Sequence, residues 1–163
     1  MIFKVLSKKI DKDFGAPVMS KTGEWIEDLL GAARESGDTS LIACCGRGCA
    51  SRKGNLQGME QLHRAAAEVG CVTAADYAAF LKKALPLTIV DVDDGIDLHL
   101  NKVECSCPIH KELTQNTDRL CECTRGHEIA EWSAFFGQPV EIEIVESFLR
   151  GGSDCVTGIR YDK

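Results

Sequence analysis

The spacing of hydrophobic residues divides the chain into two halves near Pro86. Before this residue, apolar side chains recur every three or four positions, which is the period of an amphipathic helix. The clearest stripe begins at Trp25 and follows Ser20, a capping type of residue, while Gly37 interrupts it. The pattern predicts four helices, within residues 22–37, 41–50, 59–70 and 73–86.

After Pro86 the period changes to two, which is typical of strands with one buried face. Segment 87–92, a turn at 93–95 and the alternating residues 96–101 predict one hairpin, and segments 140–144 and 155–161 predict a second. A helix is expected at 128–136, between the two hairpins.

The predicted fold class is therefore α+β, with N-terminal helices packed on an antiparallel β-sheet and one further helix between the two hairpins. We expect residues 1–163 to form a single domain, with a mainly helical half at 1–86 and the antiparallel sheet plus helix at 87–163.

Composition and charge say little about the fold, but they restrict the classes of partner that the protein can bind. The chain is 44% hydrophobic and 27% charged, with a net charge of -6. An acidic chain is a poor partner for nucleic acid or anionic lipid, so we expect neither. The N-terminus shows no signal-peptide pattern, and no apolar run approaches the roughly 20 residues of a membrane span, so a cytoplasmic location is expected.

Two Cys-x-Cys pairs are the strongest chemical feature. Cys105 and Cys107 form the first pair, and Cys121 and Cys123 form the second. On an extended strand, residues two positions apart point to the same face, so the two pairs together would present four thiolates to one soft metal ion. Zinc is the expected cofactor, with an iron–sulfur cluster less favoured. The alternative is a set of ordinary cross-strand thiols without metal.

Further candidates lie outside these pairs. Cys45, Cys49 and Cys155 are additional thiols that could take part in the same chemistry. Around Cys45 and Cys49, glycines at 46 and 48 are equally consistent with tight helix packing. Another group of residues shares large aromatic rings that could line a ligand pocket or simply form the core: Trp132, Phe136 and Phe148.

The C-terminal segment 139–160, with its strand, its Gly-x-x-x-Cys turn from Gly151 to Cys155 and its closing strand, resembles the end of the 4-vinyl-reductase-type ligand-binding domains. It is also similar to the L-2-amino-thiazoline-4-carboxylic acid hydrolase-like proteins, and the cysteine content is similar to a cysteine-rich bacterial branch. The resemblance implies an α+β fold with a small-molecule pocket. Some members bind zinc near this hairpin, where Cys155 matches one ligand position, whereas Ser147 and Ile144 depart from the pattern.

Two functional hypotheses follow. The first is a cytoplasmic cysteine-rich module that binds a small ligand or a zinc-type metal, as a sensor or binding protein. The second is an enzyme of the same fold, a hydrolase or reductase that uses one of the cysteines. A small molecule is the expected partner in both, and exposed sheet edges are compatible with a homodimer.

Overall fold

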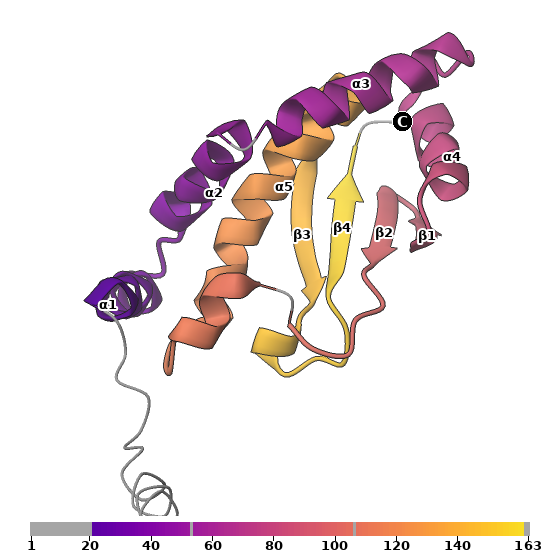
Figure 1. The fold of residues 1–163 in the computed structure, drawn as a ribbon. Helices are drawn as coiled ribbons and strands as arrows, with labels where there is room; N and C mark the ends of the chain where they lie inside the picture. The colour runs from indigo at the N-terminus through magenta and orange to yellow at the C-terminus, as the bar shows by residue number, and fades with distance from the viewer. Residues whose placement is uncertain (1–20, 53, 106, 162–163) are drawn as a thin grey trace, which may run out of the picture.

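The computed structural model describes residues 21–52, 54–105 and 107–161 (Figure 1). It is an α+β fold, as predicted. Its helices and strands, in chain order, are α1 (Lys21–Ser36), α2 (Ser40–Arg52), α3 (Asn55–Glu68), α4 (Ala74–Ala84), β1 (Thr88–Val92), β2 (Gly95–His99), α5 (Cys121–Phe136), β3 (Glu141–Glu146) and β4 (Val156–Arg160). Three short 3-10 helices lie between them: η1 (Pro108–Glu112), η2 (Thr117–Leu120) and η3 (Phe148–Arg150).

The four N-terminal helices begin and end close to the predicted signals. At the start of α4, the Thr73 hydroxyl accepts a hydrogen bond from the Asp76 amide at 3.2 Å, and the Asp76 carboxylate accepts one from the Thr73 amide at 2.8 Å. This reciprocal capping box satisfies backbone groups that the first helical turn leaves without partners. Ser20, the residue expected to cap the first helix, lies outside the described residues.

The strands form one antiparallel sheet in the order β1-β2-β4-β3. The two predicted hairpins therefore lie side by side, and β2 and β4 are the inner strands. The pairing of β3 with β4 shifts register between Ile144 and Glu146, which is a β-bulge.

Helix α5 runs along the sheet, with α2 on its outer side and α3 crossing near its end (Figure 1). The main core lies between α5, α4 and the sheet, and its fully buried members include Leu81, Ile96, Phe135 and Ile159. Burial of side chains this large stabilises the fold by roughly 1.5–3 kcal/mol each. A second cluster joins α1 and α2 to the 3-10 helices and includes Leu30, Ile42, Leu113 and Leu120.

The structure corrects the expected conformation of the cysteine pairs. Cys121 and Cys123 lie in the first turn of α5, which begins earlier than the predicted position 128. Cys105 and Cys107 lie in the irregular segment before η1. Residues two apart on a helix point about 200° apart, so the helical pair cannot share one face as it would on a strand.

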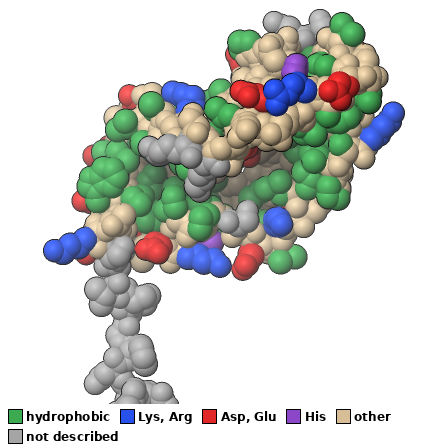
Figure 2. Space-filling view, turned by 45° about the horizontal axis from the view of Figure 1, so that its top comes forward, with side chains coloured by type: hydrophobic (Ala, Val, Ile, Leu, Met, Phe, Trp, Pro, Cys, Tyr) green, Lys and Arg blue, Asp and Glu red, His purple; other side chains and the backbone are tan. Residues whose placement is uncertain are grey.

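The face seen in Figure 2 carries acidic and basic side chains scattered among exposed apolar ones. The large hydrophobic residues most exposed to solvent include Trp25, Val72 and Val103. None of the described helices combines the length and the apolar character that crossing a membrane requires.

Candidate functional site

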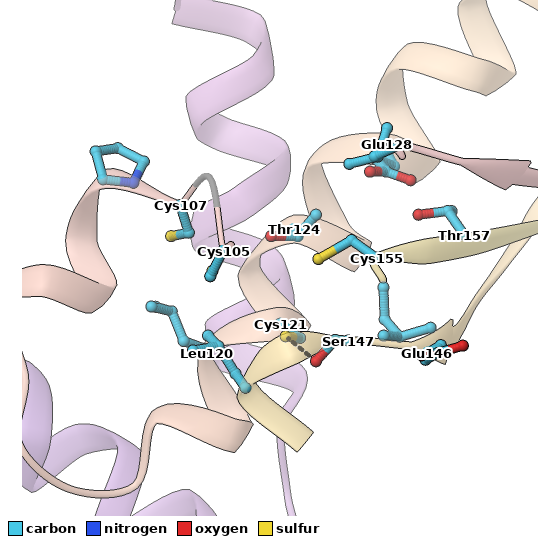
Figure 3. A pocket seen from close by; sticks show the side chains of 14 residues that line it. Cys105, Cys107, Leu120, Cys121, Thr124, Glu128, Glu146, Ser147, Cys155 and Thr157 are labelled. Atoms are coloured by element: carbon cyan, nitrogen blue, oxygen red, sulfur yellow. Dashed lines mark hydrogen bonds between the residues drawn. The ribbon is translucent and has the colours of Figure 1, made fainter. Parts of the chain in front are cut away.

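A cavity of about 180 Å³ lies where the start of α5 meets the end of β3 and the beginning of β4 (Figure 3). The segment between β2 and η1 closes its other side. Its walls are formed by five apolar residues, four cysteines and five polar residues: Leu100, Pro108, Leu120, Ile144, Leu149, Cys105, Cys107, Cys121, Cys155, Thr124, Glu128, Glu146, Ser147 and Thr157.

The cavity continues the main core along the same faces of α5 and β4. Along β4 and the residue before it, the side chains become smaller from the buried Ile159 to Thr157 and then Cys155. Each of these residues is two positions from the next, so they share a face. Toward the start of α5, the aromatic Phe135 gives way to Thr124 and Cys121. The core is hollow here because small side chains replace large ones between the same two layers.

The four cavity cysteines come from three parts of the chain. Cys105 and Cys107 lie on the segment after β2, Cys121 is the first residue of α5, and Cys155 directly precedes β4. Figure 3 shows the Cys155 sulfur turned into the space that it shares with Cys105. The Cys121 thiol donates a hydrogen bond to the buried Ser147 hydroxyl at 3.3 Å.

Burial favours the protonated form of two of these thiols. It raises the pKa of Cys105, and the neighbouring Cys107 and Cys155 add to the effect, while a backbone hydrogen bond at Cys107 opposes it. Burial likewise raises the pKa of Cys121, against the opposing influence of Ser147 and Arg150. Near neutral pH, both side chains therefore behave as small hydrophobic groups with weak S–H donors.

Glu128 supplies the carboxyl group on the part of the cavity wall that α5 forms. It follows Cys121 and Thr124 at positions i+7 and i+4, so that all three lie on one face of α5. Its Oε2 atom is shielded from solvent and has no hydrogen-bond partner among the described residues. Burial raises the pKa of Glu128 to about 7, with a further rise from Glu131, while the nearby side-chain donors of Thr157 and Trp132 oppose this rise.

Glu146 holds the turn that carries Cys155 and, in Figure 3, points away from the shared space. Its Oε1 atom accepts hydrogen bonds from the Ser153 hydroxyl and the Asp154 amide, each at 3.0 Å. These bonds to Ser153 and Asp154 lower the pKa of Glu146 and keep it ionised. The carboxylate therefore positions the chain next to Cys155.

The structure brings together three of the four predicted metal-binding cysteines, Cys105, Cys107 and Cys121, at one cavity. Cys123 is not part of its lining and packs instead against the second hydrophobic cluster beside α1. Cys155, which the sequence suggested as an additional thiol, takes the fourth place at the cavity wall. Within the described residues, no three His, Cys, Asp or Glu side chains stand close enough together to hold a metal ion.

The remaining predicted residues lie elsewhere. Cys45 is exposed and Cys49 half-buried on α2, and neither lines the cavity. Trp132 and Phe136 belong to the main core, where each packs edge-on against Phe135 with ring centroids 6.0 and 5.0 Å apart.

Phe148 is half-buried at the start of η3. Like Trp132 and Phe136, it is absent from the lining of the cavity described above.

Sequence reasoning missed Thr124 and Glu128 as cavity residues. The prediction lacked the correct start of α5. A helix that begins at Cys121 places residues 124 and 128 on the same face as that cysteine. With the helix expected to begin at 128, this period was not visible.

Comparison with known proteins assigns no family. No protein-family model and no curated protein matches the chain. Among solved structures, the chain is similar to trafficking protein particle complex subunit 3 from Naegleria fowleri, whose crystal structure has palmitic acid covalently bound. The two are 14% identical over 87% of this chain and 96% of that chain, with a TM-score of 0.38, which is too low to support a functional argument.

Proposed function

We propose that this protein is a small-ligand-binding module, acting as a sensor or binding protein, and that its binding site is the cavity between α5 and the β3–β4 hairpin. The observation that carries the proposal is a cavity lined mainly by apolar side chains and cysteine thiols, with a few polar groups in its wall; burial keeps two of the thiols, Cys105 and Cys121, protonated. Such a combination is typical of small-molecule sites, where apolar walls supply affinity and a few polar groups supply orientation.

The size of the cavity restricts the ligand. At about 180 Å³, it is smaller than most drug-sized sites, which hold roughly 300–1,000 Å³. It is close to an engineered apolar cavity of about 150 Å³ in another protein that binds benzene. A ligand with one ring or a short branched chain therefore fits, whereas a long-chain molecule would have to displace part of the wall.

Two neighbouring residues on β3 provide a matched test. Ile144 lines the cavity, whereas Val145 is 46% exposed. Ile144→Phe should fill the cavity and abolish binding of toluene, measured by ligand-observed NMR. Val145→Phe adds the same ring outside and should leave binding unchanged. Failure of the parent protein to bind toluene and other one-ring probes, or equal binding by both variants, would contradict the proposal.

A soft metal ion is the second candidate, because four cysteines line the same cavity. Thiolates are preferred zinc ligands at about 2.3 Å, and zinc binding would displace the protons that burial favours. The four sulfurs would have to converge by side-chain rotation, since no three candidate ligands among the described residues stand together already.

Two sets of metal-binding cysteines can be distinguished by experiment. The cavity offers Cys155 as the fourth ligand, whereas the sequence predicted Cys123. Elemental analysis of protein prepared anaerobically without chelator would establish whether metal is bound. Cys155→Ser should then release the metal and lower the melting temperature, while Cys123→Ser should retain it, because Cys155 lines the cavity and Cys123 does not. Retention by Cys155→Ser with loss by Cys123→Ser would restore the original set of Cys105, Cys107, Cys121 and Cys123.

The hydrolase or reductase hypothesis receives less support from the cavity. A nucleophilic cysteine acts as a thiolate and requires a lowered pKa. Burial raises the pKa of Cys105 and Cys121 instead. We therefore favour a binding role for this site.

A further inference from the structure

The unpartnered oxygen of Glu128 distinguishes this cavity from a purely apolar one. The carboxyl group lies on the wall formed by α5, and Figure 3 shows it beside Thr157 of β4. Its Oε2 atom is out of contact with solvent and has no hydrogen-bond partner among the described residues. A buried polar atom without a partner destabilises a fold, so such atoms are uncommon unless a ligand or function satisfies them.

We propose that the ligand of this cavity is a small uncharged molecule with a hydrogen-bond acceptor, such as a carbonyl oxygen, and that the Glu128 side chain turns from its shielded position toward the ligand, so that its protonated carboxyl group donates a hydrogen bond to it. This inference rests on the proposed function, since it names the class of ligand for the same cavity.

The charged and titratable groups around Glu128 favour an uncharged ligand. On its own helix, Glu131 adds a like charge that disfavours an anion. On β3, the Glu146 carboxylate is already bonded to Ser153 and Asp154. The remaining titratable groups of the wall are the cysteines described above, and no lysine, arginine or histidine is among the described lining residues.

A cationic ligand would require Glu128 to ionise within the same apolar walls. Removing both charges from water carries a desolvation cost that their attraction repays only with good geometry and further hydrogen bonds. A neutral acid and a neutral acceptor avoid most of this cost. Because burial raises the pKa of Glu128 to about 7, the protonated donor is available in slightly acidic and neutral solution.

The experiment compares toluene with acetophenone, which has a similar ring and adds a carbonyl acceptor. Affinities are measured by NMR titration at pH 5.5 and pH 8.5 for the full chain, for Glu128→Gln and for Glu128→Met. Glutamine keeps a neutral N–H donor at both pH values, whereas methionine keeps the approximate length and removes the hydrogen bond. Ile144→Phe serves as the blocked-cavity control.

The parent protein should prefer acetophenone over toluene by about five- to tenfold at pH 5.5, as expected for one net hydrogen bond. It should lose this preference at pH 8.5, where the ionised carboxylate has no proton to donate. Glu128→Gln should keep the preference at both pH values, and Glu128→Met should bind both probes without preference.

The outcomes distinguish failure of the Glu128 hydrogen bond from failure of the binding cavity itself. If the parent binds both probes equally at both pH values, or if Glu128→Met retains the preference, the role of Glu128 is overturned while the cavity remains a binding site. If neither probe binds the parent, or if Ile144→Phe binds both as well as the parent, the proposed function itself fails.

Discussion

Gly46 of α2 lies directly against the backbone of α5 at Cys123. A β carbon added at Gly46 would lie 1.9 Å from the Cys123 carbonyl oxygen. The contact is repeated one turn further along, where a β carbon on Gly126 would lie 1.9 Å from the Ala43 carbonyl oxygen. The two helices therefore approach each other through Gly46 and Gly126, and this explains Gly46, among the α2 cysteines, as a packing residue.

Gly46→Ala should destabilise the protein. The added methyl group meets backbone atoms that cannot rotate away, so the helices must separate, at a cost of about 1–3 kcal/mol. Gly48→Ala is the matched control on the same helix, because nothing lies within 4 Å of its added β carbon. That variant should gain roughly 0.5–1 kcal/mol from the higher helix propensity of alanine. Urea denaturation measures both, and equal effects would contradict the close approach of α2 to α5.

Ionisation of Glu128 should make stability fall as the pH rises. Its pKa is about 7 in the folded protein against an ordinary 4.5, so between these values the folded state binds more protons than the unfolded state. Stability is then lost progressively from about pH 4.5 to about pH 7, by up to ~3 kcal/mol at about 1.4 kcal/mol per pKa unit. Urea denaturation of the parent at pH 5 and pH 8 measures this change.

Glu128→Gln provides the control for the other titrating groups. Its amide does not ionise, so the difference in unfolding free energy between the variant and the parent should increase in favour of the variant from pH 5 to pH 8. A difference that stays constant with pH would show that Glu128 has an ordinary pKa.

The cysteines should differ strongly in their accessibility to alkylating reagents. Cys44 and Cys45 are exposed on α2, whereas Cys121 is buried and its thiol is bonded to Ser147. Brief treatment of the native protein with N-ethylmaleimide should modify Cys44 and Cys45 first and Cys121 last, as read by peptide mass spectrometry. Early modification of Cys121 would place it at the surface and contradict the cavity wall.

Glu146→Ala should loosen the turn before Cys155. The variant removes the hydrogen bonds that the Glu146 carboxylate accepts from Ser153 and Asp154, so Cys155 should react faster with N-ethylmaleimide and amide exchange should accelerate at the turn. Glu141→Ala removes the same charge from an exposed position of the same strand and serves as the control. An equal response in both variants would assign the effect to net charge alone.

The order of helices and strands could be predicted from the sequence because it depends on local signals. The capping residue Thr73, the turn at 93–95 and the alternation in 140–144 each act within a few residues, and the structure confirms the elements that they predict. The start of α5 was predicted too late. Its first turn contains two cysteines and carries no side-chain cap, so neither the hydrophobic period nor a capping residue marks its beginning.

The composition of the candidate site depended on tertiary structure. The concentration of thiols near 105–123 was visible in the sequence, but their arrangement depended on the conformation of each segment. The start of α5 turns Cys121 toward the cavity and Cys123 away from its lining, and the pairing of β4 with β2 and β3 brings Cys155 to the opposite wall. Glu128 joins them through the helical period. Residue spacing determines which side chains share a face of one helix or strand. A cavity between elements depends on how side chains from several of them pack together, which becomes visible in the folded structure.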